Sequence, residues 1–119
     1  MVTANPEFWQ MAEKMIRESR IVIDRAKGSV HPHWPEIIYP LDYGYLENTK
    51  SPDGDGIDIW LGSDQCGLSA IFVTVDSVKR DSEIKLIINC TRDEIAVIDA
   101  FYNHYDTMKG LLILREEEK

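Results

Sequence analysis

Hydrophobic residues near the N-terminus recur at the spacing of one helix face. The apolar positions are Phe8, Met11, Ala12, Met15 and Ile16. Asn5 can cap a helix, and Pro6 suits the first helical position because its missing N–H would have no partner there. The pattern therefore predicts an amphipathic helix within residues 5–20, whose apolar stripe covers one side of the core.

A second helix is predicted near the C-terminus. Thr91 is followed three residues later by Glu94, which is the spacing of a capping box. The apolar face of this helix would consist of Ile95, Ile98, Phe101, Tyr102 and Tyr105. Gly110 follows and separates this helix from the last apolar run.

Short β-prone runs occupy most of the remaining chain, at residues 21–24, 57–61, 70–75, 83–89 and 111–114. No helical pattern separates the runs between residues 21 and 89, which disfavours a doubly wound parallel sheet. We predict a single domain over residues 1–119 of the mainly β (α+β) class. Its expected architecture is a small β-barrel, closed or strongly curled, flanked by an N-terminal and a C-terminal helix.

Composition narrows the classes of function. The chain has 119 residues, 44% of them hydrophobic, and a formal net charge of −8, which argues against a nucleic-acid or anionic-membrane partner. No apolar run is long enough to span a bilayer, and the N-terminus lacks the pattern of a signal peptide, so a cytoplasmic location is expected. Cys66 and Cys90 lie outside any CxxC or Cys/His cluster and are expected to be reduced thiols, with Cys90 in the core.

Three carboxylates lie within six residues at Asp53, Asp55 and Asp58. Carboxylates this close repel one another unless a cation neutralises them. Oxygen ligands without Cys or His at zinc spacing favour Mg²⁺, Mn²⁺ or Ca²⁺ over zinc. An EF-hand is excluded because Ile57 and Asp58 stand where that loop needs a polar ligand and a glycine.

A second set of charges lies on a predicted strand. Asp81, Glu83 and Lys85 alternate and would share one face, which is either a solvated strand face or part of a site. Mg²⁺ is commonly held by a few carboxylates together with substrate phosphates. An acidic loop near Lys85 and the basic residues Arg25 and Lys27 therefore points to phosphoryl chemistry.

Several segments resemble the soluble, magnesium-dependent inorganic pyrophosphatases. Residues 38–45 (IYPLDYGY) and 53–58 (DGDGID) resemble the family's YPxxYG and DGDPxD motifs, with matching spacing between them. Residues 21–29 (IVIDRAKGS), 81–85 (DSEIK) and 101–105 (FYNHY) resemble flanking family segments. The resemblance implies an OB-like barrel with helices packed around it, and hydrolysis of pyrophosphate to two phosphates with Mg²⁺, or alternatively Mn²⁺, as cofactor.

The resemblance also implies roles for individual residues. The metal ligands would be Asp53, Asp58, Glu83, Asp81 and Asp24. Asp55 would accept a proton from the attacking water, and Lys85, Tyr43 and Tyr105 would bind phosphate oxygens. A homo-oligomer is expected as well, because relatives associate and a small barrel has apolar edges to cover.

The chain departs from the family pattern in its phosphate-binding part. The segment between the first strand and the YPxxYG motif is largely missing, so Arg25, Lys27 or a histidine at position 31 or 33 would have to replace the lost cations. Gly56 stands where the family has proline, and Asp106 where it has lysine. Three interpretations remain open: a compact pyrophosphatase, a hydrolase of another phosphate ester or anhydride, and a non-catalytic OB-like module that binds a metal or a phosphate ligand.

Overall fold

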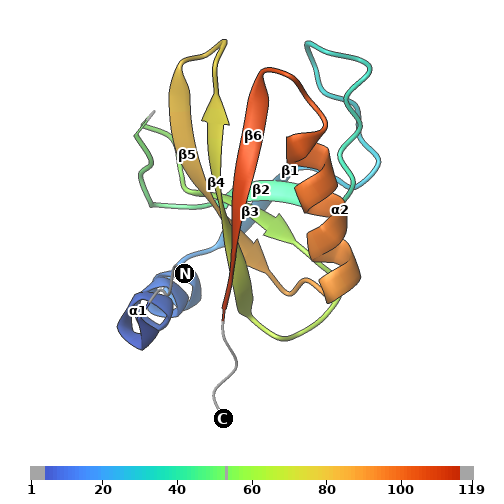
Figure 1. The fold of residues 1–119 in the computed structure, drawn as a ribbon. Coiled ribbons are helices and arrows are strands. Elements are labelled where there is room, and N and C mark those ends of the chain that lie inside the picture. The colour runs from blue at the N-terminus through green and yellow to red at the C-terminus, as the bar shows by residue number, and fades with distance from the viewer. Residues whose placement is uncertain (1–4, 53, 116–119) are drawn as a thin grey trace.

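The computed structural model describes residues 5–52 and 54–115 and contains two helices and six strands (Figure 1). In chain order they are α1 (Pro6–Arg17), β1 (Ile21–Arg25), β2 (Asp42–Leu46), β3 (Asp58–Leu61), β4 (Leu68–Asp76), β5 (Asp81–Ile88), α2 (Arg92–Asn103) and β6 (Met108–Leu114). No helix in the described part of the chain is long and apolar enough to cross a membrane.

The six strands form one mixed sheet in the order β1-β2-β3-β5-β4-β6. All neighbouring pairs are antiparallel except β3 and β5, which run parallel, with Asp58 opposite Lys85. Over the described residues no pairing joins the edge strands β1 and β6, so the sheet is open. The curled form of the predicted architecture is therefore correct, and the closed form is not.

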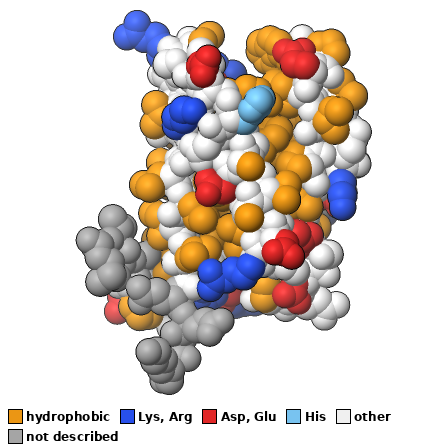
Figure 2. All heavy atoms as spheres, turned by 45° about the vertical axis from the view of Figure 1, so that its right-hand side comes forward, with side chains coloured by type: hydrophobic (Ala, Val, Ile, Leu, Met, Phe, Trp, Pro, Cys, Tyr) orange, Lys and Arg blue, Asp and Glu red, His pale blue; other side chains and the backbone are white. Residues whose placement is uncertain are grey.

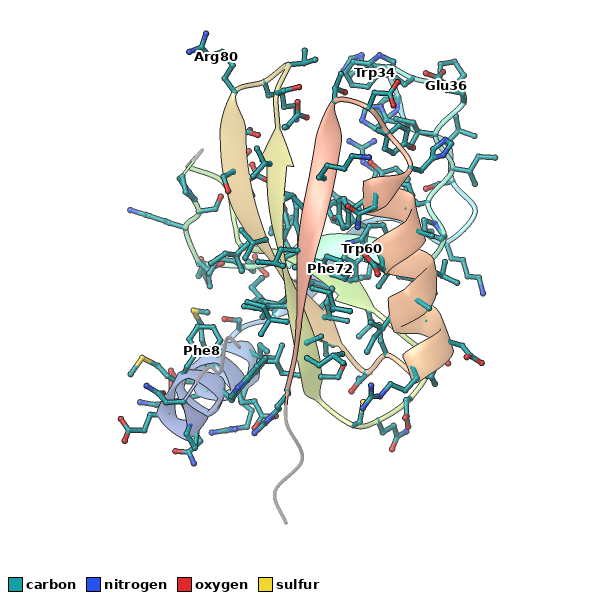
Figure 3. The ribbon with its side chains drawn as sticks, in the orientation of Figure 1. Phe8, Trp34, Glu36, Trp60, Phe72 and Arg80 are labelled. Atoms are coloured by element: carbon teal, nitrogen blue, oxygen red, sulfur yellow. The ribbon has the colours of Figure 1, made fainter. Side chains whose placement is uncertain are left out.

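Each face of the sheet packs against one helix (Figure 1). α1 covers the face that carries Leu46, Ile59 and Leu86, and α2 covers the face that carries Trp60 and Phe72. Figure 3 shows Trp60 and Phe72 at the centre of the molecule, on the side of the sheet toward α2. The two cores hold the sheet rigidly from both sides, so the polar residues among them have fixed positions.

Both predicted helices are confirmed, because their start signals are local. The Asn5 side chain accepts a hydrogen bond from the Phe8 N–H at 2.8 Å. Thr91 and Glu94 form the complete capping box at the start of α2. Cys90 is buried as expected, and burial raises the pKa of its thiol to about 12.

The five predicted strands are also found, with ends shifted by a few residues, but β2 was not predicted. Its sequence contains Asp42 and Gly44, two residue types that are rare in strands. Gly44 is required here because β1 lies so close that a Cβ would collide with the carbonyl oxygen of Val22. The close contact between the two backbones explains why this strand lacks a strand-like sequence.

Candidate active site

A cavity of about 440 Å³ opens between the α2 side of the sheet, the C-terminal part of α2 and the loop before β2. Its lining combines aromatic, apolar and charged side chains: His31, Trp34, Glu36, Ile37, Tyr39, Tyr43, Thr74, Asp76, Val78, Lys79, Asp81, Glu83, Lys85, Phe101, Tyr102, Tyr105, Thr107 and Met108. Figure 2 shows hydrophobic side chains gathered in the upper half of the molecule, on the side where α2 comes forward. The cavity therefore has an aromatic wall and a charged floor.

The floor is organised around the ammonium group of Lys85. Lys85 Nζ donates to Asp58 Oδ2 at 2.6 Å, to Glu83 Oε2 at 2.6 Å and to the Tyr43 hydroxyl at 2.9 Å. The three acceptors come from β3, β5 and β2, and the strand register brings them together. Because Asp58 lies opposite Lys85 in the parallel pair, their side chains project from the same face of the sheet.

Burial gives these contacts their strength. Lys85 is only 6% exposed, although its two carboxylate partners keep part of their surface in water. Burial alone would lower the pKa of Lys85, but the oxygens of Tyr102, Tyr43 and Asp58 outweigh it and raise that pKa. For the Tyr43 phenol, burial is the main cause of a raised pKa. At neutral pH the floor thus consists of a charged ammonium group and a protonated phenol.

Five of the residues predicted from the sequence line this cavity, and a sixth, Asp58, contacts one of them. Glu83, Lys85 and Tyr43 form its floor, and Asp58 lies beside it, bonded to Lys85. Asp81 lies at its rim, at the start of β5, and Tyr105 lies just beyond the end of α2 with its ring 5.9 Å from that of Phe101. Their chemical roles remain predictions.

The other predicted residues are more dispersed. The Arg25 guanidinium lies 5.9 Å from the centre of the Tyr39 ring, next to the cavity but not in its lining. Asp24, Lys27 and Asp55 are exposed and do not line the cavity, and Asp53 lies outside the described residues. Gly56, where the family has proline, has no room for a side chain, since a Cβ would lie 2.6 Å from the carbonyl oxygen of Leu46.

Several lining residues were not singled out from the sequence. Thr74 and Asp76 alternate with apolar residues on β4, and this alternation was the available signal. Thr74 is buried, and its hydroxyl donates to the Glu83 carbonyl oxygen at 3.4 Å. Trp34 lies at the upper rim, in the loop before β2 (Figure 3), and no periodic pattern marks a residue in such a loop.

Asp58 and Glu83 are the two carboxylates beside Lys85 that could hold a hard divalent cation. The Asp58 and Glu83 oxygens converge on one cationic nitrogen, and two carboxylates together with waters and substrate oxygens are sufficient for Mg²⁺. The donors are oxygens only, so a zinc site is not indicated. Among residues 5–52 and 54–115, no group of three or more His, Cys, Asp or Glu side chains is placed to hold a metal ion.

Comparison with known proteins finds similarity to one kind of enzyme. No model of a protein family matches the chain. The chain is 27% identical over 100 residues to an inorganic pyrophosphatase of Campylobacter jejuni, an alignment that covers 76% of the chain and 51% of that protein. The chain therefore resembles an inorganic pyrophosphatase in sequence over most of its length. It spans about half the length of the curated relative that it matches.

Solved structures show that the fold is shared as well. An inorganic pyrophosphatase from Helicobacter pylori superposes with a TM-score of 0.55 at 18% identity, covering 81% of this chain and 82% of that one. A protein described as an inorganic phosphatase from Anaplasma phagocytophilum gives a TM-score of 0.53 at 14% identity, covering 79% and 81%. The sheet with its two flanking helices therefore has the OB-like α+β fold of these enzymes.

Proposed function

We propose that the chain hydrolyses inorganic pyrophosphate to two phosphates in a reaction that depends on a divalent cation. The observation that carries this proposal is the convergence of Asp58 and Glu83 on Lys85 at the floor of an open cavity. The similarity in sequence and fold to inorganic pyrophosphatases supports the choice of substrate.

The residues of the floor have complementary tasks in this proposal. Tyr43 would donate its O–H to a phosphate oxygen, and the positive charge of Lys85, whose three N–H groups bind Asp58, Glu83 and Tyr43, would stabilise the negative charge that grows on the leaving phosphate. Asp58 and Glu83 are the ligands that would hold Mg²⁺, with Mn²⁺ as the alternative. When bound there, such a cation lowers the pKa of coordinated water and neutralises phosphate charge.

The remaining roles are extensions of the same proposal. Asp55 is the proposed acceptor of the proton from the attacking water, and Asp53, Asp81 and Asp24 are proposed ligands of further cations. Arg25, Lys27 and Tyr105 are the proposed contacts to the outer phosphate oxygens. Support for these roles comes from the motif resemblance, and for Asp81 and Tyr105 also from their place in the cavity lining.

Phosphate release from pyrophosphate with and without Mg²⁺ tests the proposal. We expect the release of phosphate to require the cation. Its rate should fall by at least about 100-fold in Asp58→Asn, because the loss of a metal ligand or of a general base typically lowers activity by this much. Asp55→Asn tests the proposed base, and Asp64→Asn is the control, since Asp64 is exposed and accepts from its neighbour Gln65. Absence of release by the folded wild-type protein would refute the proposal.

Assembly and location belong to the proposal too. Val75, Ile84 and Leu111 are 57%, 48% and 58% exposed and lie together on the sheet face opposite the cavity, which supports a homo-oligomer. Light scattering of the purified protein tests this. The two free cysteines support a reducing compartment such as the cytoplasm.

A further inference from the structure

The cavity has room for a larger ligand than pyrophosphate. Its volume of about 440 Å³ falls in the range of sites that enclose organic molecules. Pyrophosphate has no apolar surface to bury, yet much of the lining is aromatic or aliphatic. The floor alone provides the polar contacts that phosphates need, so the upper part of the cavity requires another explanation.

The upper part forms an aromatic wall. His31 stacks on Tyr39 with an interplanar angle of 11°, and its ring centre lies 4.8 Å from that of Trp34. Trp34 is 49% exposed, and Val78, from the turn between β4 and β5, is 73% exposed. Both line the cavity, so a flat ring that entered it would cover apolar surface that water now contacts.

The hydrogen bond that His31 makes in this wall suits a neutral imidazole. His31 Nδ1 accepts from the His33 N–H at 3.0 Å, which leaves Nε2 as the protonated nitrogen of the neutral imidazole. Burial lowers the pKa of His31, and Arg25 lowers it further. A neutral His31 offers a ring face and one N–H donor, which are the groups that bind a heteroaromatic base.

The charged side chains of the lining differ in the contacts that they make. Glu83 is paired with Lys85, and Asp76 Oδ1 accepts from the N–H groups of Val78 and Lys79 at 3.0 Å each. Glu36, Asp81 and Lys79 are exposed and also line the cavity. Among the described lining residues Lys85 is the buried ammonium group, and together with a cation held at Asp58 and Glu83 it would attract the anionic groups of a ligand.

We propose that the substrate of this site is a pyrophosphate monoester that carries a planar heteroaromatic ring, of which a nucleoside diphosphate is the simplest example. The two phosphates occupy the floor at Lys85, and the ring stacks against Trp34 and His31. This inference rests on the proposed function for the phosphate end of the site. Water attacks the terminal phosphorus, the bridging P–O bond breaks, the bridging oxygen stays on the organic monophosphate, and the proton of the water passes to the products.

Hydrolysis of three compounds tests the inference: ADP, methyl diphosphate and inorganic pyrophosphate, each with Mg²⁺. We expect kcat/KM for ADP to exceed that for methyl diphosphate by at least about 10-fold, within the range that stacking of a base contributes. Trp34→Ala should lower the ratio of the two values by about 5- to 150-fold, whereas Trp34→Phe retains most of it. Phe8→Ala removes an exposed aromatic ring from α1, away from the cavity, and should leave the ratio unchanged.

The outcomes separate this inference from the proposed function. Release from pyrophosphate with equal kcat/KM for ADP and methyl diphosphate, or an unchanged ratio in Trp34→Ala, would overturn the inference alone. Release from none of the three compounds would overturn both the proposed function and the inference that rests on it.

Discussion

Replacing Lys85 by methionine tests the central interaction of the site. Methionine preserves the unbranched apolar stem and removes the ammonium group that joins Asp58 and Glu83. Removal of one partner from a buried ion pair costs about 3–5 kcal/mol, because the other charge is left without compensation. The two carboxylate side chains here are 26% and 18% exposed and regain part of their hydration. We therefore expect a loss of about 2–4 kcal/mol in the free energy of unfolding.

Urea denaturation and calorimetry measure this loss directly. For a domain of this size about 1 kcal/mol shifts the melting temperature by roughly 4 °C, so Tm should fall by about 8–16 °C. Lys79→Met is the matched control, since Lys79 lies on the same cavity but is exposed, and a surface change of this kind stays within about 0.5 kcal/mol. Equal stability of Lys85→Met and wild type would show that the strands alone hold Asp58 and Glu83 in place.

The same variant also tests the carboxylates as cation ligands. Without the ammonium group, Mg²⁺ can bind between Asp58 and Glu83 with no competitor, and a ligand that binds only the folded state raises its stability. Millimolar Mg²⁺ should therefore raise the Tm of Lys85→Met more than that of wild type, relative to protein in EDTA. A smaller rise in the variant would refute the assignment of these two carboxylates as ligands.

Three further predictions concern the framework of the site. Tyr102→Phe leaves the buried Trp60 Nε1–H, now 2.7 Å from the Tyr102 hydroxyl, without an acceptor, and should cost about 1–3 kcal/mol in a urea titration. Gly44→Ala should abolish folding, seen as loss of the near-ultraviolet circular dichroism signal, because β1 leaves no space for a Cβ. Burial would raise the pKa of Glu94, but N–H donors, including that of Thr91, hold it below its ordinary value of 4.5. The contribution of Glu94 to the free energy of unfolding is therefore present above about pH 4.5 and is lost as the pH falls through its lower folded-state pKa. The Tm of Glu94→Gln, measured over this pH range, should depend less on acid than the Tm of wild type.

The helices could be predicted from the sequence because their signals are local. A cap, a proline and apolar residues at helical spacing all lie within one segment, whereas β2 is defined by its partner. Gly44 fits there because β1 passes close to its backbone, and contact between distant segments leaves no mark in the sequence of either. The sequence could not predict whether the sheet closes either, because closure depends on whether β1 pairs with β6.

In the candidate site, too, local signals could be predicted from the sequence and contacts between distant segments could not. The alternation on β5 placed Glu83 and Lys85 on one face, and that expectation agrees with their shared position in the cavity. The parallel pairing with β3, which brings Asp58 to the same ammonium group, depends on strand order and could be expected only from the family resemblance. The rim residue Trp34 has no signal of either kind.

The balance between charge and aromatic surface in the cavity bears on how the proposed phosphate ligand would be held. The sequence predicts a deficit of cations opposite the carboxylates, with Arg25 and Lys27 as the candidates to fill it. In the structure Lys27 is exposed outside the cavity, and the Arg25 guanidinium faces the Tyr39 ring. The loop that follows them supplies aromatic rings to the cavity where cations were expected. Among the described residues Lys85 is the one buried cation of the lining, so the proposed ligand would draw further affinity from its other end, where a ring would stack on this wall.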